Sequence, residues 1–238
     1  GGPCGQTAGV TTTERDPGSF RDPAGHVHRL GGRIFRTVSS RAASDFEAAE
    51  GSGLLDRLVA GGRLVPHRRL DAAEAADLGL VAPVVLEHPR IPFVSWPWEW
   101  TFPALKAAAL LHLDLHLEAL SHGFTLSDAT AFNVQFRGPV PVFIDTLSLR
   151  PYREGEYWLG HRQFCEEFLN PLLLDALFGV SPAAWSRGAL GGVTATDLAA
   201  LLPARRWLSW NLAVHVLLQA RFQSRATRKG AARAASAR

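Results

Sequence analysis

The chain has 238 residues, of which 47% are hydrophobic and 20% are charged, as in globular proteins with a sizeable core. It contains no run of 18 or more apolar residues, so no membrane span is expected. Cys4 and Cys165 are too few for a disulfide framework, and we expect a cytoplasmic protein that does not engage a membrane.

The excess of basic residues belongs to the end of the chain. Residues 221–238 hold six basic and no acidic residues, which leaves 19 basic against 22 acidic residues for positions 1–220. This Ala/Arg-rich end lacks interleaved aromatic residues, so we expect a solvated tail over 223–238 and do not expect nucleic-acid binding. Residues 1–18 have no basic segment leading into an apolar one and are expected to form a disordered leader.

The first half of the chain predicts strands with intervening helices. Two β-prone runs, 26–30 and 33–38, flank Gly31-Gly32 and predict a hairpin. Ser39 or Ser40 is suited to begin a helix that continues to about Ala60. Its candidate core residues are apolar: Phe46, Leu54, Leu55 and Leu58.

Further strands are predicted at 63–66 and 84–88, with a short helix within 71–80. The segment 91–100 is extended, aromatic and interrupted by proline. Its three tryptophans are expected either to form core between two lobes or to line a hinge.

The second half predicts one long helix and then further helices. Thr101 is suited to begin a helix over 102–122, which is rich in Ala and Leu on most faces and should be buried. Gly123 ends it. A strand is predicted at Val142–Asp145, and the chain should be helical from Trp158 onward.

Asp128, Asn133 and Asp145 form the one chemically distinctive pattern. An acid is followed five residues later by an amide, and twelve residues after that by a second acid closing an apolar strand. In kinases, such residues supply a base for the substrate hydroxyl and two ligands for Mg²⁺. The alternative interpretation is structural: Asp128 begins a turn, Asn133 caps a strand end, and Asp145 is an ordinary strand-end acid.

This segment resembles the catalytic core of the protein-kinase-like superfamily, in particular aminoglycoside-phosphotransferase-like proteins. The resemblance implies an α+β, two-lobed kinase-like fold, with a strand-rich first lobe and hinge over 19–100 and a helical second lobe over 101–222. It also implies that Asp128 is the catalytic base, that Asn133 and Asp145 are metal ligands, and that Mg²⁺ and ATP are the cofactors. The sequence departs from the usual pattern at Leu126, Thr130 and Thr146.

The first lobe of such a fold also needs a cation for the phosphates and an acid to orient it. Neither of the two lysines, Lys106 and Lys229, falls on an early strand. Arg36 is the well-placed cation, and Glu47 or Glu50 on the following helix is its candidate partner, which makes these three the candidate nucleotide-binding residues. The alternative is an exposed hairpin arginine with solvated helix acids.

Two other polar patterns favour a structural interpretation. His112 and His116 are four residues apart, as zinc ligands can be, with Asp114 between them. No third ligand is evident nearby, so polar positions on a buried helix are preferred. Cys165 is expected to pack as a small apolar residue.

Over about residues 19–222 the chain is also similar to the N-terminal part of bacterial NoeA-like proteins, a nodulation-related family associated with SAM-dependent methyltransferases. The similarity rests on several segments together: 19–25, 91–100, 128–136, 142–148, 152–155 and 162–165. It implies a methyltransferase domain after this module, and no glycine-rich loop follows a strand here. We therefore expect SAM as a cofactor only if a methyltransferase domain is supplied elsewhere.

The sequence thus predicts a kinase-like module that binds nucleotide and Mg²⁺ and phosphorylates a hydroxyl of a small molecule or saccharide. The alternative is a non-catalytic binding or scaffold module that serves a methyltransferase domain or protein as its partner.

Overall fold

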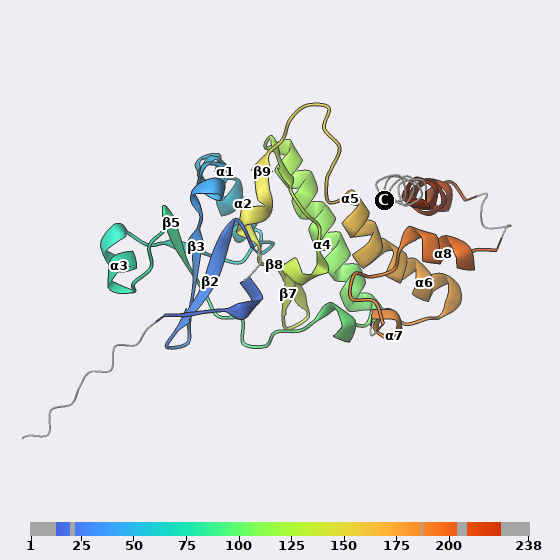
Figure 1. Cartoon of the computed structure of the whole chain (residues 1–238), viewed down its shortest axis with the longest axis horizontal. Helices are drawn as coiled ribbons and strands as arrows, with labels where there is room; N and C mark the ends of the chain where they lie inside the picture. The colour runs from blue at the N-terminus through green and yellow to red at the C-terminus, as the bar shows by residue number, and fades with distance from the viewer. Residues whose placement is uncertain (1–12, 20–21, 187, 204–208, 225–238) are drawn as a thin grey trace, which may run out of the picture.

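A computed structural model describes residues 13–19, 22–186, 188–203 and 209–224 (Figure 1). Helices and small antiparallel sheets are both present, so the predicted α+β class is confirmed. Within the described ranges, no helix has the length and apolar character needed to cross a membrane. Residues 1–12 of the expected leader and 225–238 of the expected tail lie outside the described residues.

A five-stranded antiparallel sheet forms the first part of the structure. Its strand order is β1-β2-β3-β5-β4. The bounds are β1 Glu14–Arg15, β2 Gly25–Leu30, β3 Arg33–Val38, β4 Arg68–Arg69 and β5 Val84–His88. The β2–β3 hairpin is confirmed, and Gly31 and Gly32 take its two turn positions with φ of 54° and 83°. The pairing of β1 with β2 places an ordered strand at positions where a disordered leader was expected.

The helix predicted up to Ala60 is interrupted, and this part of the prediction is wrong. The structure has α1 (Ser40–Gly51) and α2 (Leu54–Ala60), separated at Gly53, whose φ of 75° a helix does not allow. The four predicted core residues are nevertheless all buried. Beyond them, α3 (Ala72–Asp77) confirms the predicted short helix, and Asp71 caps it.

The strand predicted at 63–66 is also wrong, because this segment makes a single bridge between Leu64 and Phe143. Backbone hydrogen bonds of 2.8 Å run from Val65 N to Phe143 O and from Phe143 N to Arg63 O. The segment therefore connects the first part of the chain to the predicted catalytic strand.

The second part is organised around α4 (Phe102–Ser121), close to the predicted bounds. Two short antiparallel pairs lie beside it: β6 (Phe124–Leu126) with β9 (Leu149–Pro151), and β7 (Val134–Arg137) with β8 (Val140–Phe143). Short 3₁₀ turns complete the connections: η1 Pro17–Ser19, η2 Pro97–Glu99, η3 Ala131–Asn133 and η4 Thr146–Ser148.

Among the described residues, the chain from His161 onward is mainly helical, which agrees with the predicted start near Trp158. The helices are α5 His161–Phe164, η5 Cys165–Leu169, α6 Asn170–Phe178, α7 Pro182–Ser186, α8 Ala195–Leu201, α9 Trp210–Leu212 and η7 Ala213–Leu218. Two of them, η5 and η7, are π-helical turns that interrupt longer helices. Such turns are rare and occur frequently at functional sites.

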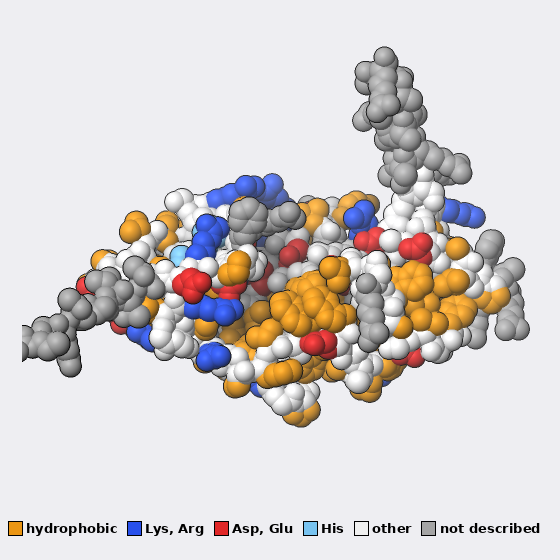
Figure 2. All heavy atoms as spheres, turned by 60° about the horizontal axis from the view of Figure 1, so that its bottom comes forward, with side chains coloured by type: hydrophobic (Ala, Val, Ile, Leu, Met, Phe, Trp, Pro, Cys, Tyr) orange, Lys and Arg blue, Asp and Glu red, His pale blue; other side chains and the backbone are white. Residues whose placement is uncertain are grey.

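One large core joins the two parts. It includes Phe46 and Leu58 from the first part together with Leu115, Phe143 and Phe168 from the second. A smaller core holds the last helices together around Leu174 and Val216. Hydrophobic side chains also gather at the centre of one face of the molecule (Figure 2). One side of α4 is exposed at Leu110 and Leu117, so the expectation that this helix is buried on most faces holds only in part.

Candidate functional site

Asp128, Asn133 and Asp145 are delivered by the two short strand pairs after α4. The segment after β6 carries Asp128, η3 ends at Asn133, and Asp145 caps η4 by accepting a 3.2 Å hydrogen bond from Leu147 N. Ile144 N donates to Asn133 O at 2.9 Å, which holds the second and third of these segments together.

The three side chains converge on one point. The Asn133 amide donates through Nδ2 to Asp128 Oδ1 at 3.1 Å and to Asp145 Oδ2 at 3.3 Å. One amide therefore bridges the two carboxylates, which are 17 positions apart in the chain. The structure brings these three predicted residues together.

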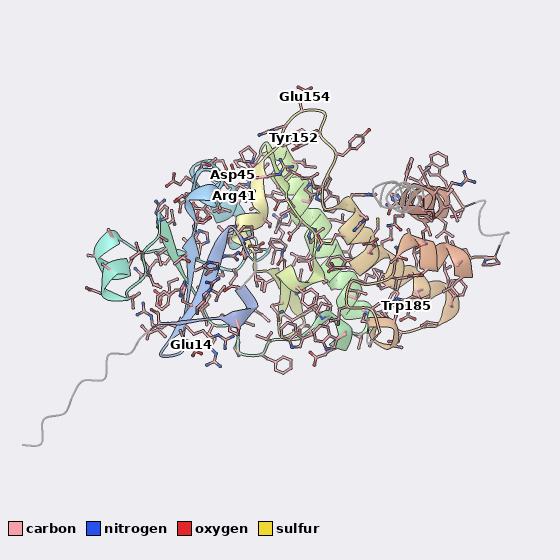
Figure 3. All side chains as sticks on the ribbon, in the orientation of Figure 1. Glu14, Arg41, Asp45, Tyr152, Glu154 and Trp185 are labelled. Carbon is pink, nitrogen blue, oxygen red and sulfur yellow. The ribbon has the colours of Figure 1, made fainter. Side chains whose placement is uncertain are left out.

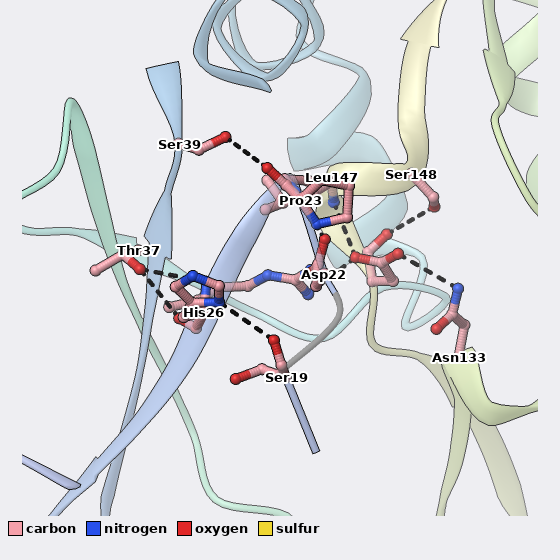
Figure 4. Close-up of polar contacts among 12 residues, drawn as sticks. Ser19, Asp22, Pro23, His26, Thr37, Ser39, Asn133, Leu147 and Ser148 are labelled. Atoms are coloured by element: carbon pink, nitrogen blue, oxygen red, sulfur yellow. Dashed lines mark hydrogen bonds and ion pairs between the residues drawn. The ribbon is translucent and has the colours of Figure 1, made fainter. Parts of the chain in front are cut away.

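Arg36 extends this group to the sheet. From β3, its Nη1 lies 2.9 Å from Asp145 Oδ1 and its Nη2 lies 2.6 Å from Asp22 Oδ2. Its side chain is only 11% exposed, so a planar guanidinium is held between two carboxylates in a largely buried setting. Figure 4 shows Asp22 and Asn133 approaching this point from different segments.

Asp22 is a member of the site that the sequence reasoning did not single out. It lies in the connection before β2 and also accepts a 2.8 Å hydrogen bond from Ala24 N. The available signal was its place in the segment 19–25, which carries part of the NoeA-like similarity.

Glu47 and Glu50 do not pair with Arg36, and that part of the prediction is corrected. Arg69 takes both of them, with its Nη2 3.2 Å from Glu47 Oε1 and its Nη1 2.9 Å from Glu50 Oε2. The reason is topological: β4 brings Arg69 next to α1, whereas Arg36 faces the connection that carries Asp22. A nucleotide-binding role for Arg36 stays a prediction.

Electrostatics distinguishes Asp128 from the other acids. Burial and, to a smaller extent, the negative charges of Asp145, Glu167 and Asp22 together raise its pKa to about 7, against a lowering by Arg36. A carboxyl with a pKa near 7 is suited to accept a proton at neutral pH.

Glu167 is a second buried acid beside the same loop. Its Oε2 accepts hydrogen bonds of 2.8 Å from Thr130 Oγ1 and from Ala131 N, and its Oε1 accepts one of 3.0 Å from Gln163 Nε2. Burial raises the pKa of Glu167 despite these donors. The η5 turn thereby fixes the loop that carries Asp128.

The residues present fit a bound Mg²⁺. The negative charges of Asp145, Glu167 and Asp22 act on Asp128 here, and Arg36 lies between Asp22 and Asp145. This excess of negative charge would be relieved by a divalent ion, and Asn133 and Asp145 offer the oxygen donors that Mg²⁺ prefers.

The hinge prediction has a mixed outcome. Trp100 is buried and packs edge-on against Phe136, whereas Trp96 and Trp98 stack on one another at 5.2 Å and Trp96 is exposed. The backbone of Ser95 is already paired, because Gln135 accepts from its N–H and donates to its carbonyl, each at 3.0 Å. Ser95 is therefore not free to pair with a nucleobase.

A pocket adjoins the same loop. Trp98 and Phe132 line it together with Glu167 and residues after α7 such as Leu190. It is small, with enclosed space for about one water molecule. Figure 3 shows Tyr152 and Glu154 on the long connection after β9 and Trp185 on α7.

His112 and His116 lie inside the structure, as the preferred interpretation held. His116 Nε2 lies 3.0 Å from Thr125 Oγ1, while neither ring nitrogen of His112 has a hydrogen-bond partner. Burial lowers the pKa of each to about 4. In the part of the chain that the structure describes, no third metal ligand joins them.

Comparison with known proteins shows similarity to a nodulation protein. No family model matches the chain. The nodulation protein NoeA of Rhizobium meliloti (strain 1021) is 48% identical to it over 214 residues. The similarity to NoeA is confirmed. The match covers 90% of this chain and 44% of the relative, so the chain spans less than half of that NoeA protein.

Proposed function

We propose that this NoeA-like chain is a kinase-like, two-lobed module that binds a nucleotide with Mg²⁺ and phosphorylates a hydroxyl of a small molecule or saccharide. The observation that carries the proposal is the Asn133 amide bridging Asp128 and Asp145, beside a sheet cation that contacts Asp145. The alternative, in which these residues only shape a turn and strand ends, does not explain why two carboxylates meet in a largely buried place.

Each residue has a role in this proposal. Asp128 accepts the proton of the attacking hydroxyl, for which a pKa of about 7 is suited. Asn133 and Asp145 would hold Mg²⁺, which would supply charge neutralisation at the phosphates. Arg36, which contacts Asp145, would add a positive charge beside the phosphates.

Nucleotide binding is tested by thermal shift with Mg-ATP. We expect wild type to be stabilised and Asp145→Asn, which keeps the size of the side chain but loses its charge, to lose most of that stabilisation. Asp114→Asn is the matched control, because Asp114 is an exposed acid on α4. No shift in wild type, or an equal shift in Asp145→Asn, would overturn the binding proposal.

Phosphoryl transfer is tested separately with labelled ATP and a panel of saccharides and hydroxylated small molecules. We expect Asp128→Asn to retain the Mg-ATP thermal shift and to lose about 100-fold or more in transfer rate. A rate equal to wild type would remove Asp128 as the base.

A further inference from the structure

A second polar cluster lies away from the acid site, where α5 meets the last helix. His161 begins α5, Cys165 begins η5, and His215 lies within η7. One ligand atom from each residue lies within 4.8 Å of the other two. It is the one such group of three His, Cys, Asp or Glu residues in the described ranges.

The distances are close to those of a tetrahedral metal site. Zinc bonds of about 2.3 Å to sulfur and about 2.0 Å to nitrogen place the two ligand atoms about 3.6 Å apart. Cys165 Sγ lies 3.9 Å from His161 Nε2, on the same helical face. The rings of His161 and His215 are 5.9 Å apart between centroids, so the second helix brings its ligand to the same place.

His161 and Cys165 contact each other and Gln219, whereas one ring nitrogen of His215 has no partner. His215 Nδ1 is buried and has no hydrogen-bond partner, although buried polar atoms normally have one. Gln219 reaches Cys165 Sγ through Nε2 at 3.3 Å, the kind of outer contact that orients a sulfur ligand. Cys165 is 1% exposed whereas His161 is exposed, so the cluster has an entry path from solvent.

Two π-helical turns place these ligands. A π turn inserts one residue into a helix, which rotates the following side chains, and such turns are found frequently at functional sites. Here η5 starts at Cys165 and η7 contains His215, so both irregular turns coincide with the cluster. Simple helix packing gives no reason for that coincidence.

We propose that His161, Cys165 and His215 form a Zn²⁺ site that ties the last helix to α5, with the fourth position open to water or a ligand. One thiolate and two imidazoles are the soft and intermediate donors that zinc prefers, and hard oxygen-binding cations are disfavoured. Binding releases the thiol proton of Cys165 to solvent, because the metal ligand is the thiolate.

The test uses the full chain without a polyhistidine tag. We expect one equivalent of zinc after dialysis against metal-free buffer, measured by mass spectrometry of the metal. We also expect that Co²⁺, added as a probe to the zinc-free chain, gives tetrahedral d–d bands and a thiolate-to-cobalt charge-transfer band.

Variants assign the ligands. Cys165→Ser should abolish the charge-transfer band, and His161→Ala or His215→Ala should each weaken Co²⁺ binding at least 10-fold. His161 is exposed, so its variant should fold, and circular dichroism checks this. His122→Ala, a histidine at the end of α4, and Cys4→Ser are the controls and should bind as wild type. Absence of a tetrahedral cobalt spectrum, or an unchanged spectrum in Cys165→Ser, would overturn the proposal.

Discussion

Two pairs of possible metal ligands have the same four-residue spacing: His112 and His116 on α4, and His161 and Cys165 on the helix that starts at α5. Trp158 lies beside both pairs and contacts the three histidines. The pair on α4 is buried among aromatic rings such as Phe143 and Phe168. The pair on α5 is reached by His215 from another helix and opens to solvent at His161. Helical spacing alone therefore does not define a metal site, because the third ligand and the access come from elsewhere in the fold.

The largest expected effect concerns the turn that places Cys165. Gly192 has φ of 82°, and a Cβ there would lie 2.0 Å from Glu166 O, so no side chain fits. Gly192→Ala should destabilise the chain by about 3 kcal/mol or more and weaken metal binding at the α5 pair. Urea unfolding measures the first effect. Gly188→Ala is the control, since the nearest contact of a Cβ there is 3.7 Å away, and an equal loss in both variants would contradict the prediction.

The second-largest expected effect is stabilisation by added zinc, which should depend on the pair His161 and Cys165 and not on the pair His112 and His116. At 100 times the dissociation constant, a ligand of the folded state stabilises by about 2.7 kcal/mol. Calorimetric melting should show that stabilisation in wild type and in His112→Leu, and should not show it in His215→Ala. A zinc response lost in His112→Leu would mean that the α4 pair is the one that binds.

The α4 pair should instead appear in the pH dependence of stability. The folded pKa of His112 is about 4 and its ordinary value is 6.5, so the unfolded chain binds more protons between these values. Its stabilising contribution is present above pH 6.5 and is lost as pH falls toward 4. We therefore compare the free energy of unfolding of His112→Leu with that of wild type at two pH values. The difference should favour the variant by about 2 kcal/mol more at pH 5 than at pH 7.5. Urea unfolding at the two pH values checks this, and an equal difference at both would refute it.

Asp128 should show a smaller effect of the opposite sign. Its folded pKa of about 7 lies above the ordinary value of 3.8, so its protonated form stabilises the fold at low pH. That contribution is lost as pH rises through 7. After allowance for solvent screening of a partly exposed carboxyl, Asp128→Asn should stabilise the chain by about 1 kcal/mol more at pH 8 than at pH 5. Unfolding of both proteins at the two pH values measures it, and a larger gain at pH 5 would show the wrong sign.

Local patterns explain what could be predicted from sequence. Gly31-Gly32 predicts its hairpin because few residues other than glycine suit both turn positions. The order of a helix, a polar loop and an apolar strand predicts that Asp128, Asn133 and Asp145 come together. In each case, neighbouring residues contain the necessary information.

The failures involve contacts between distant segments. The resemblance to kinases predicts that Glu47 or Glu50 pairs with Arg36, but β4 places Arg69 beside them instead. Asp22 reaches the site from a connection before the first hairpin. His215 lies 50 positions after Cys165 with no local motif, so spacing rules could not find it.

The ion pairs of Arg36 also bear on how the chain assembles during synthesis. Asp22, Arg36 and the β2–β3 hairpin leave the ribosome early, whereas Asp145 follows only after the whole of α4. Until then the guanidinium has Asp22 as its acidic neighbour, and Leu64 has no Phe143 with which to form its bridge. The acid site can therefore form only when the two parts of the chain dock, which makes its assembly a late event in co-translational folding.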